Sequence, residues 1–272
     1  MDNRPIGVFD SGLGGLTAVR ALRRILPGED LIYFGDTSRV PYGGRSPETI
    51  LKYARQDLRF LRSFDLKAIL IACGTVSTTS LDILQAENAP LPMVGVVEPT
   101  CRRAAAQTRN KKVGIIATQA SFRSGVYERT IAGLDPAIQV FAKPCPLFVP
   151  LVENGRFLPG DPVIETVARE YLEELRATGM DALILGCTHY PLLTQVIGGV
   201  MGAGVELISA GEESAFELKR LLQAKSLLAA PDRVGDATYY ASDRAADFEK
   251  LAGWFLQEDL RYEVNQIDID RY

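Results

Sequence analysis

Short apolar runs alternate with longer amphipathic segments along the whole chain. The runs are rich in β-branched residues and have the length of buried strands, and the segments between them carry apolar residues at helical spacing. This alternation is typical of parallel α/β architecture, in which strands are buried between helical layers. We expect strands at 6–9, 31–34, 68–72, 93–97, 113–117, 138–142, 182–185, 205–208 and 238–241, and helices at 16–26, 47–64, 125–131, 162–178 and 212–228.

Two stretches of the chain resemble two others at a similar offset. Residues 67–73 match residues 181–187, so Cys73 and Cys187 end equivalent strands 114 residues apart. Residues 6–11 likewise match residues 113–118, with Gly7 and Gly114 separated by 107 residues. Apolar strands also resemble one another by chance, which is the alternative explanation. The similar offsets favour two related α/β halves.

If the halves are related, the two cysteines lie at the carboxyl ends of equivalent strands, where open α/β sheets bind their ligands. We therefore expect two similar parallel-sheet α/β domains that face each other across a central active-site cleft. Asp10 and Cys73 belong to the first domain, and Glu153, Cys187 and His189 to the second. The predicted domains are 1–97 with 210–272, and 98–209, with linkers near 97–99 and 209–211.

The composition and charge argue against nucleic acid and membrane partners. The net charge is -4 and the Lys and Arg residues are scattered, so nothing indicates nucleic acid. Membrane helices need roughly 20 apolar residues, which no run approaches. The N-terminus lacks the layout of a signal peptide. We expect a cytoplasmic protein with no membrane partner.

Four cysteines and a single histidine, without paired C-x-x-C spacing, give no indication of a metal site. A cysteine in a reducing compartment is ordinarily a small apolar core residue, and we expect this of Cys101 and Cys145. Cys73 and Cys187 differ because each ends a predicted strand. Removing an α-proton without a cofactor needs a base on one face of the carbon and an acid on the other, and a thiolate paired with a thiol meets that need.

Polar residues accompany both cysteines. Asp10 and Ser11 close the first strand and lead into the glycine-rich stretch 12–15, whose amides can approach a substrate carboxylate or simply form a tight turn. This stretch is not a dinucleotide fingerprint, because Thr17 stands where the third glycine would be. His189 follows Cys187 by two residues and either orients that thiol or is a structural histidine. Glu153 is a candidate to influence the same site, or is a solvated glutamate.

At this point the chain resembles the glutamate racemases of bacterial cell-wall synthesis, within the aspartate/glutamate racemase superfamily. The resemblance covers nearly the whole chain in several long motifs that occur in the right order. They are Gly7-Val-Phe-Asp10-Ser11-Gly-Leu-Gly-Gly-Leu-Thr17, Phe34-Gly-Asp-Thr37, Val40-Pro-Tyr42-Gly43, Ile71-Ala-Cys73-Gly74-Thr75, Gly95-Val-Val-Glu-Pro99, 145–153 and Leu185-Gly-Cys187-Thr188-His189-Tyr-Pro-Leu.

The resemblance implies a cofactor-independent reaction that supplies D-glutamate for peptidoglycan. Cys73 would act on D-glutamate and Cys187 on L-glutamate, with Asp10, Glu153 and His189 as supporting catalytic groups. A homodimer is also implied. The residues that would bind the substrate are Asp10, Ser11, Tyr42, Gly43, Gly74, Thr75, Thr188 and His189.

The chain departs from the family pattern at two places. Gly74 replaces an asparagine whose amide would bind the substrate, and losing such a contact typically costs roughly 0.5–1.5 kcal/mol. Ser209 stands where an acidic residue is common, which we expect to alter only local helix capping. An aspartate racemase or another isomerase of the superfamily stays open, because two thiols do not measure side-chain length. A non-catalytic binding protein is a second alternative, favoured only by Gly74.

Overall fold

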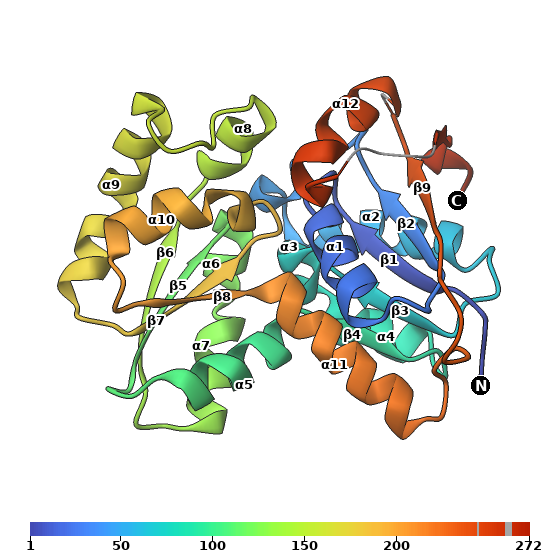
Figure 1. The fold of residues 1–272 in the computed structure, drawn as a ribbon, viewed down its shortest axis with the longest axis horizontal. Helices are drawn as coiled ribbons and strands as arrows, with labels where there is room; N and C mark the ends of the chain where they lie inside the picture. Colours follow the sequence, from blue (N-terminus) through green and yellow to red (C-terminus); the bar gives the residue numbers. More distant parts are fainter. Residues whose placement is uncertain (244, 259–262) are drawn as a thin grey trace.

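The computed structural model describes residues 1–243, 245–258 and 263–272, which form two α/β domains side by side (Figure 1). The domains are built on separate parallel sheets, and the predicted fold class is confirmed. The exact domain boundaries stay a prediction. None of the helices within these described ranges is both long and apolar enough to span a bilayer.

The first domain contains a six-stranded sheet in the order β10-β9-β2-β1-β3-β4. Every neighbouring pair of strands runs parallel. The central strand pairs Ile6 with Leu31 on one side and with Ala68 on the other. The strands are β1 (Ile6–Asp10), β2 (Leu31–Gly35), β3 (Ala68–Ile71), β4 (Met93–Gly95), β9 (Ala237–Ala241) and β10 (Val264–Gln266).

The second domain contains a four-stranded parallel sheet in the order β6-β5-β7-β8. Its strands are β5 (Lys112–Ala117), β6 (Gln139–Pro144), β7 (Ala182–Gly186) and β8 (Glu206–Ser209). β5 lies between β6 and β7, as β1 lies between β2 and β3 in the first domain. The stretches that match in the sequence therefore occupy equivalent places in the two sheets.

Helices follow most of the strands and cover the sheets. The first-domain helices are α1 (Leu16–Ile25), α2 (Pro47–Leu61), α3 (Gly74–Thr79), α4 (Leu81–Glu87), α12 (Ala245–Leu256) and the 3-10 helices η1 (Tyr42–Gly44) and η3 (Ile269–Arg271). The others are α5 (Val97–Gln107), α6 (Gln119–Ser124), α7 (Val126–Leu134), α8 (Phe148–Glu153), α9 (Pro162–Ala177), η2 (Tyr190–Leu193), α10 (Thr194–Met201) and α11 (Ala210–Ala224).

Helix α11 carries the chain from the second sheet back to the first and lies between α1 and α5 (Figure 1). Its packing against α1 is close, because a Cβ on Gly211 would lie 3.3 Å from the Cα of Ala18. The largest cluster of buried apolar side chains runs through both domains, from Ile6 and Val8 to Leu183 and Leu185. The two domains are thus joined by a shared core.

All nine predicted strands are present, with small differences at their ends. The polar strand β10 was not predicted. The expected linkers at 97–99 and 209–211 coincide with helix starts, because α5 begins at Val97 and α11 at Ala210. Pro99 fits the first turn of α5, where a proline costs no hydrogen bond.

The topology places both cysteines at equivalent points. Strand order reverses around β1 and again around β5, so adjacent crossovers leave in opposite directions. Ligands of open α/β sheets bind at such points, beyond the carboxyl ends of the strands. Ser11 and Cys73 follow β1 and β3, and Thr118 and Cys187 follow β5 and β7. The fold therefore directs both thiols toward the region between the domains.

Candidate active site

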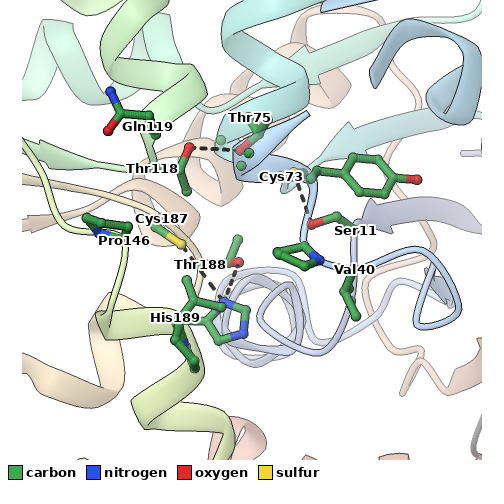
Figure 2. A pocket seen from close by; sticks show the side chains of 18 of the residues that line it. Ser11, Val40, Cys73, Thr75, Thr118, Gln119, Pro146, Cys187, Thr188 and His189 are labelled. Carbon is green, nitrogen blue, oxygen red and sulfur yellow. Dashed lines mark hydrogen bonds between the residues drawn. The ribbon is translucent and has the colours of Figure 1, made fainter. Parts of the chain in front are cut away.

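A cavity of about 330 Å³ lies between the carboxyl ends of the two sheets, and both cysteines line it (Figure 2). Cys73 and Cys187 are buried, with 4% and 7% of their surface exposed. Ten of the eleven predicted site residues line this cavity, and Asp10 does not. The ten are Ser11, Tyr42, Gly43, Cys73, Gly74, Thr75, Glu153, Cys187, Thr188 and His189.

The first thiol is buried and has a hydroxyl as its hydrogen-bond partner. Cys73 ends the loop after β3 and precedes α3. Its Sγ donates a hydrogen bond to the Ser11 Oγ at 3.4 Å. Burial and, secondarily, the charge of nearby Asp10 raise the pKa of Cys73 to about 12. Cys73 is therefore a protonated thiol at neutral pH and is suited to donate a proton.

Asp10 lies beneath the cavity wall rather than in it. Its side chain is fully buried, accepts a hydrogen bond from the Gly12 amide at 3.1 Å and accepts another from the Thr188 hydroxyl at 3.4 Å. Burial raises the pKa of this carboxyl. The Gly12 amide of the glycine turn is thus bound by the chain's own Asp10 and not by a substrate carboxylate. Asp10 joins the two domains instead.

The second thiol has a different partner. The Cys187 Sγ lies 3.9 Å from the Nδ1 of His189, and the Nε2 of the same imidazole lies 3.0 Å from the Glu153 Oε1. Burial lowers the pKa of His189, but hydrogen bonds to Cys187 and Glu153 outweigh burial and raise it to about 10. His189 is therefore an imidazolium at neutral pH, placed between a carboxylate and the sulfur.

Tyr42 lines the cavity, while its hydroxyl is bound to residues of its own domain. That hydroxyl donates to buried Asp36 and lies 2.9 Å from the Asp57 Oδ2. Burial raises the pKa of Tyr42 well above its ordinary value. A hydrogen bond from this hydroxyl to a substrate is not compatible with that geometry.

Thr75 lines the cavity and contacts the second domain through its hydroxyl. Its hydroxyl lies 3.0 Å from that of Thr118, and the two side chains face each other in Figure 2. Thr118 was missed as a site residue, although the internal repeat pairs it with Ser11. Cys145, predicted to be structural, lines the cavity as well, while Cys101 bonds the Tyr127 carbonyl at 3.8 Å. The other unpredicted lining residues are Gly12, Val40, Pro41, Gly44, Gln119, Pro146, Val149, Pro150 and Gly186.

Apart from the cysteines and Tyr42, Glu153 and His189 are the lining residues with ionisable side chains. Elsewhere in the described ranges, as in this cavity, no three His, Cys, Asp or Glu side chains are gathered as a metal site would require. The arrangement is a small chamber with two thiols, contributed by two similar domains and set in unlike environments. Such a site is typical of an enzyme that moves protons to and from a small substrate.

Comparison with known proteins identifies the family to which this chain belongs. A model of the Asp/Glu/hydantoin racemase family matches residues 16–215. A glutamate racemase of Geobacter metallireducens is 43% identical over 267 residues, covering 98% of this chain and 97% of the relative. The chain belongs to the Asp/Glu/hydantoin racemase family and is an amino-acid racemase.

Solved structures agree with that assignment. The glutamate racemase isoform RacE1 from Bacillus anthracis superposes with a TM-score of 0.92 at 36% identity, over 98% of both chains. The glutamate racemase of Francisella tularensis, solved in complex with D-glutamate, superposes with a TM-score of 0.91 at 38% identity over the full length of both chains. Similarity of this extent supports glutamate racemase function.

Proposed function

We propose that this protein interconverts L- and D-glutamate without a cofactor, using Cys73 and Cys187 as the two proton-transfer groups. The observation that carries the proposal is the presence of both thiols in one small cavity, each at the end of an equivalent strand. The full-length similarity to glutamate racemases, one of them solved with D-glutamate, supports glutamate as the substrate. Its role would be to supply D-glutamate for peptidoglycan.

The environments of the two sulfurs suggest how the reaction starts from L-glutamate. His189 carries a positive charge 3.9 Å from Cys187 and stabilises the negative charge that Cys187 bears as a base. Cys187 takes the α-proton, and the electron pair stays on the α-carbon. Cys73, a neutral thiol, gives its proton to the opposite face and becomes the thiolate. In the reverse direction Cys73 takes the proton and Cys187 returns one.

Ser11, Thr75 and Thr188 are proposed to bind the substrate through their hydroxyls, and Gly43 and Gly74 through their backbone. Glu153 keeps His189 protonated and oriented. The homodimer implied by the resemblance and the cytoplasmic location stay predictions. The aspartate alternative has no observation in its favour, because the full-length relatives described above are glutamate racemases.

Single variants Cys73→Ala and Cys187→Ala test the mechanism. Losing either acid or base should reduce racemisation by roughly 10²–10⁴-fold in both directions, since positioned proton transfer contributes about that much. The assay is circular dichroism of glutamate, aspartate and glutamine side by side, with deuterium uptake at the α-carbon followed in heavy water. Cys101→Ala, which removes a buried thiol outside the cavity, is the control. Racemisation above a tenth of the wild-type rate in either variant would exclude the two-thiol mechanism.

A further inference from the structure

The residue after Cys73 and the residue before Cys187 contact each other at the wall of the cavity. A Cβ on Gly74 would lie 2.5 Å from the carbonyl oxygen of Gly186 and 3.5 Å from its carbonyl carbon. Real Cβ atoms essentially never come within 3.0 Å of such a neighbouring atom. Because Gly186 presents backbone here, no side-chain rotation can relieve the clash. Any side chain at position 74 must therefore move one backbone away from the other.

The backbone at Gly186 is restrained by strand pairing. Gly186 ends β7 and pairs in register with Ala117 of β5. β7 is an inner strand, with β8 on its other side. Position 186 admits no side chain either, because a Cβ on Gly186 would lie 2.9 Å from the Ile116 carbonyl oxygen and 3.3 Å from the Tyr127 hydroxyl.

The Gly74 side is also restrained. Gly74 begins α3, and its carbonyl accepts a hydrogen bond from Thr78 at 3.0 Å. The next residue, Thr75, is bonded to Thr118, and the Thr78 hydroxyl lies 3.2 Å from the Ser121 hydroxyl. These bonds connect α3 to α6 of the second domain. The backbones at Gly74 and Gly186 are therefore both restrained where they contact each other.

We propose that Gly74 is a positioning residue that fixes the separation of the two thiols by allowing backbone contact with Gly186. The inference deepens the proposed function and rests on it for its catalytic meaning. It differs from the sequence-based interpretation, in which Gly74 only lacks an amide that would bind the substrate. Within the observed geometry an asparagine would not simply add a hydrogen bond, because its Cβ has no space.

Two substitutions separate these interpretations. Gly74→Ala adds the Cβ without an amide, and Gly74→Asn adds both. If Gly74 sets the spacing, both variants should lower kcat by about 10–100-fold in each direction with a smaller change in KM, since a displacement near 1 Å at reacting groups can cost about 10²-fold. If the missing amide matters instead, Gly74→Asn should lower KM and keep kcat, and that result would overturn the proposal.

The matched control is Gly133→Ala in α7, where an added Cβ meets no atom within 4 Å. It should keep wild-type kinetics and unfold at the wild-type temperature or above. Wild-type kcat in Gly74→Ala would also overturn the proposal. Thermal unfolding reports whether each variant is folded. If the asparagine variant does not fold, the alanine variant, which adds a single carbon, decides the matter.

A second measurement is independent of activity. Dibromobimane, a reagent that bridges two nearby thiols, is applied to the wild type and to Gly74→Ala, and the Cys73–Cys187 bridged peptide is quantified by mass spectrometry. We expect at least a twofold lower yield in the variant, and an equal yield would contradict the spacing role. If the wild type fails to racemise glutamate while the bridging yield still falls, the proposed function is wrong and the positioning role of Gly74 stands.

Discussion

At the scale of single residues, the two thiols differ in their surroundings although their positions in the fold are equivalent. Cys73 faces a serine hydroxyl in a buried setting that raises its pKa to about 12. Cys187 faces an imidazolium whose charge is supported by Glu153. This asymmetry favours a resting state with the proton on Cys73, ready to be given to a substrate deprotonated from the other face.

The charge on His189 can be measured directly, because it is the only histidine in the chain. We expect its imidazole NMR signals to titrate near pH 10 in the wild type. In Glu153→Gln the titration should move to lower pH, because a neutral amide supports the imidazolium less well than a carboxylate. Glu170→Gln, an exposed change on α9, is the control. An unchanged midpoint in Glu153→Gln would contradict the role assigned to Glu153.

The same shift makes a prediction about stability. The folded-state pKa of His189 lies above its unfolded value of 6.5, so folding takes up a proton between pH 6.5 and 10. The stabilisation is fully present below pH 6.5 and is lost as the pH rises through about 10. Urea unfolding should therefore show a steeper decline in the free energy of unfolding across this window for the wild type than for Glu153→Gln. Parallel curves would contradict this linkage.

At the scale of elements, a buried polar cluster joins η1, which lines the cavity, to α2. Arg39 donates to Asp36 at 2.7 Å and to Asp57 at 2.6 Å, and the Tyr42 hydroxyl contacts both carboxylates. Burial, and then the charge of Asp36, raise the pKa of Asp57 well above its ordinary value. Buried charges of this kind are tolerated only when they are paired and hydrogen-bonded. The cluster therefore fixes the loop that presents Tyr42 and Gly43.

Tyr42→Phe tests this assignment. Removing the hydroxyl takes one hydrogen-bond donor from a pair of buried carboxyl groups, so the free energy of unfolding should fall by about 1–3 kcal/mol. The effect on stability should exceed the effect on KM, because the hydroxyl does not face the cavity. Chemical unfolding and steady-state kinetics measure the two effects, with Tyr240→Phe in the same apolar cluster as the control. Unchanged stability with a tenfold higher KM would instead show that the hydroxyl binds substrate.

At the scale of the whole molecule, hydrogen bonds across the domain junction complete the site. The single proton of the buried Thr17 hydroxyl on α1 is shared between the carbonyl of Thr188 at 3.0 Å and that of Gly14 at 2.8 Å. Together with Asp10 and Thr188, this contact ties the loop that carries Cys187 to the first domain. The geometry of the second thiol thus depends on residues of the other half.

Thr17→Val should loosen this junction. The variant leaves a buried carbonyl without its donor, so the free energy of unfolding should fall by about 1–3 kcal/mol. Amide hydrogen exchange of residues 187–189 should become faster, because the loop loses its tie to α1. Thr166→Val removes a local bond on the exposed face of α9 and is the control. Unchanged exchange at 187–189 would show that Thr17 does not restrain the loop.

Much of the architecture was predictable because buried parallel strands produce apolar runs that are visible in one dimension. The repeat in the sequence also located the two cysteines and paired Ser11 with Thr118. The strand β10 was missed because its three residues, Val264 to Gln266, form no apolar run. The helical conformation at the two expected linkers was not predicted, since helix starts and turns use the same residue types.

The sequence by itself determined the alternating pattern, the two matching strand ends and the residue types that can carry protons. Only the tertiary structure decided how those residues meet: that Asp10 lies behind the cavity, that the Tyr42 hydroxyl turns away from it, and that Gly74 touches Gly186. The physical reason is that periodicity reports which side of an element is buried. Contacts between residues more than a hundred positions apart depend on how the two sheets pack.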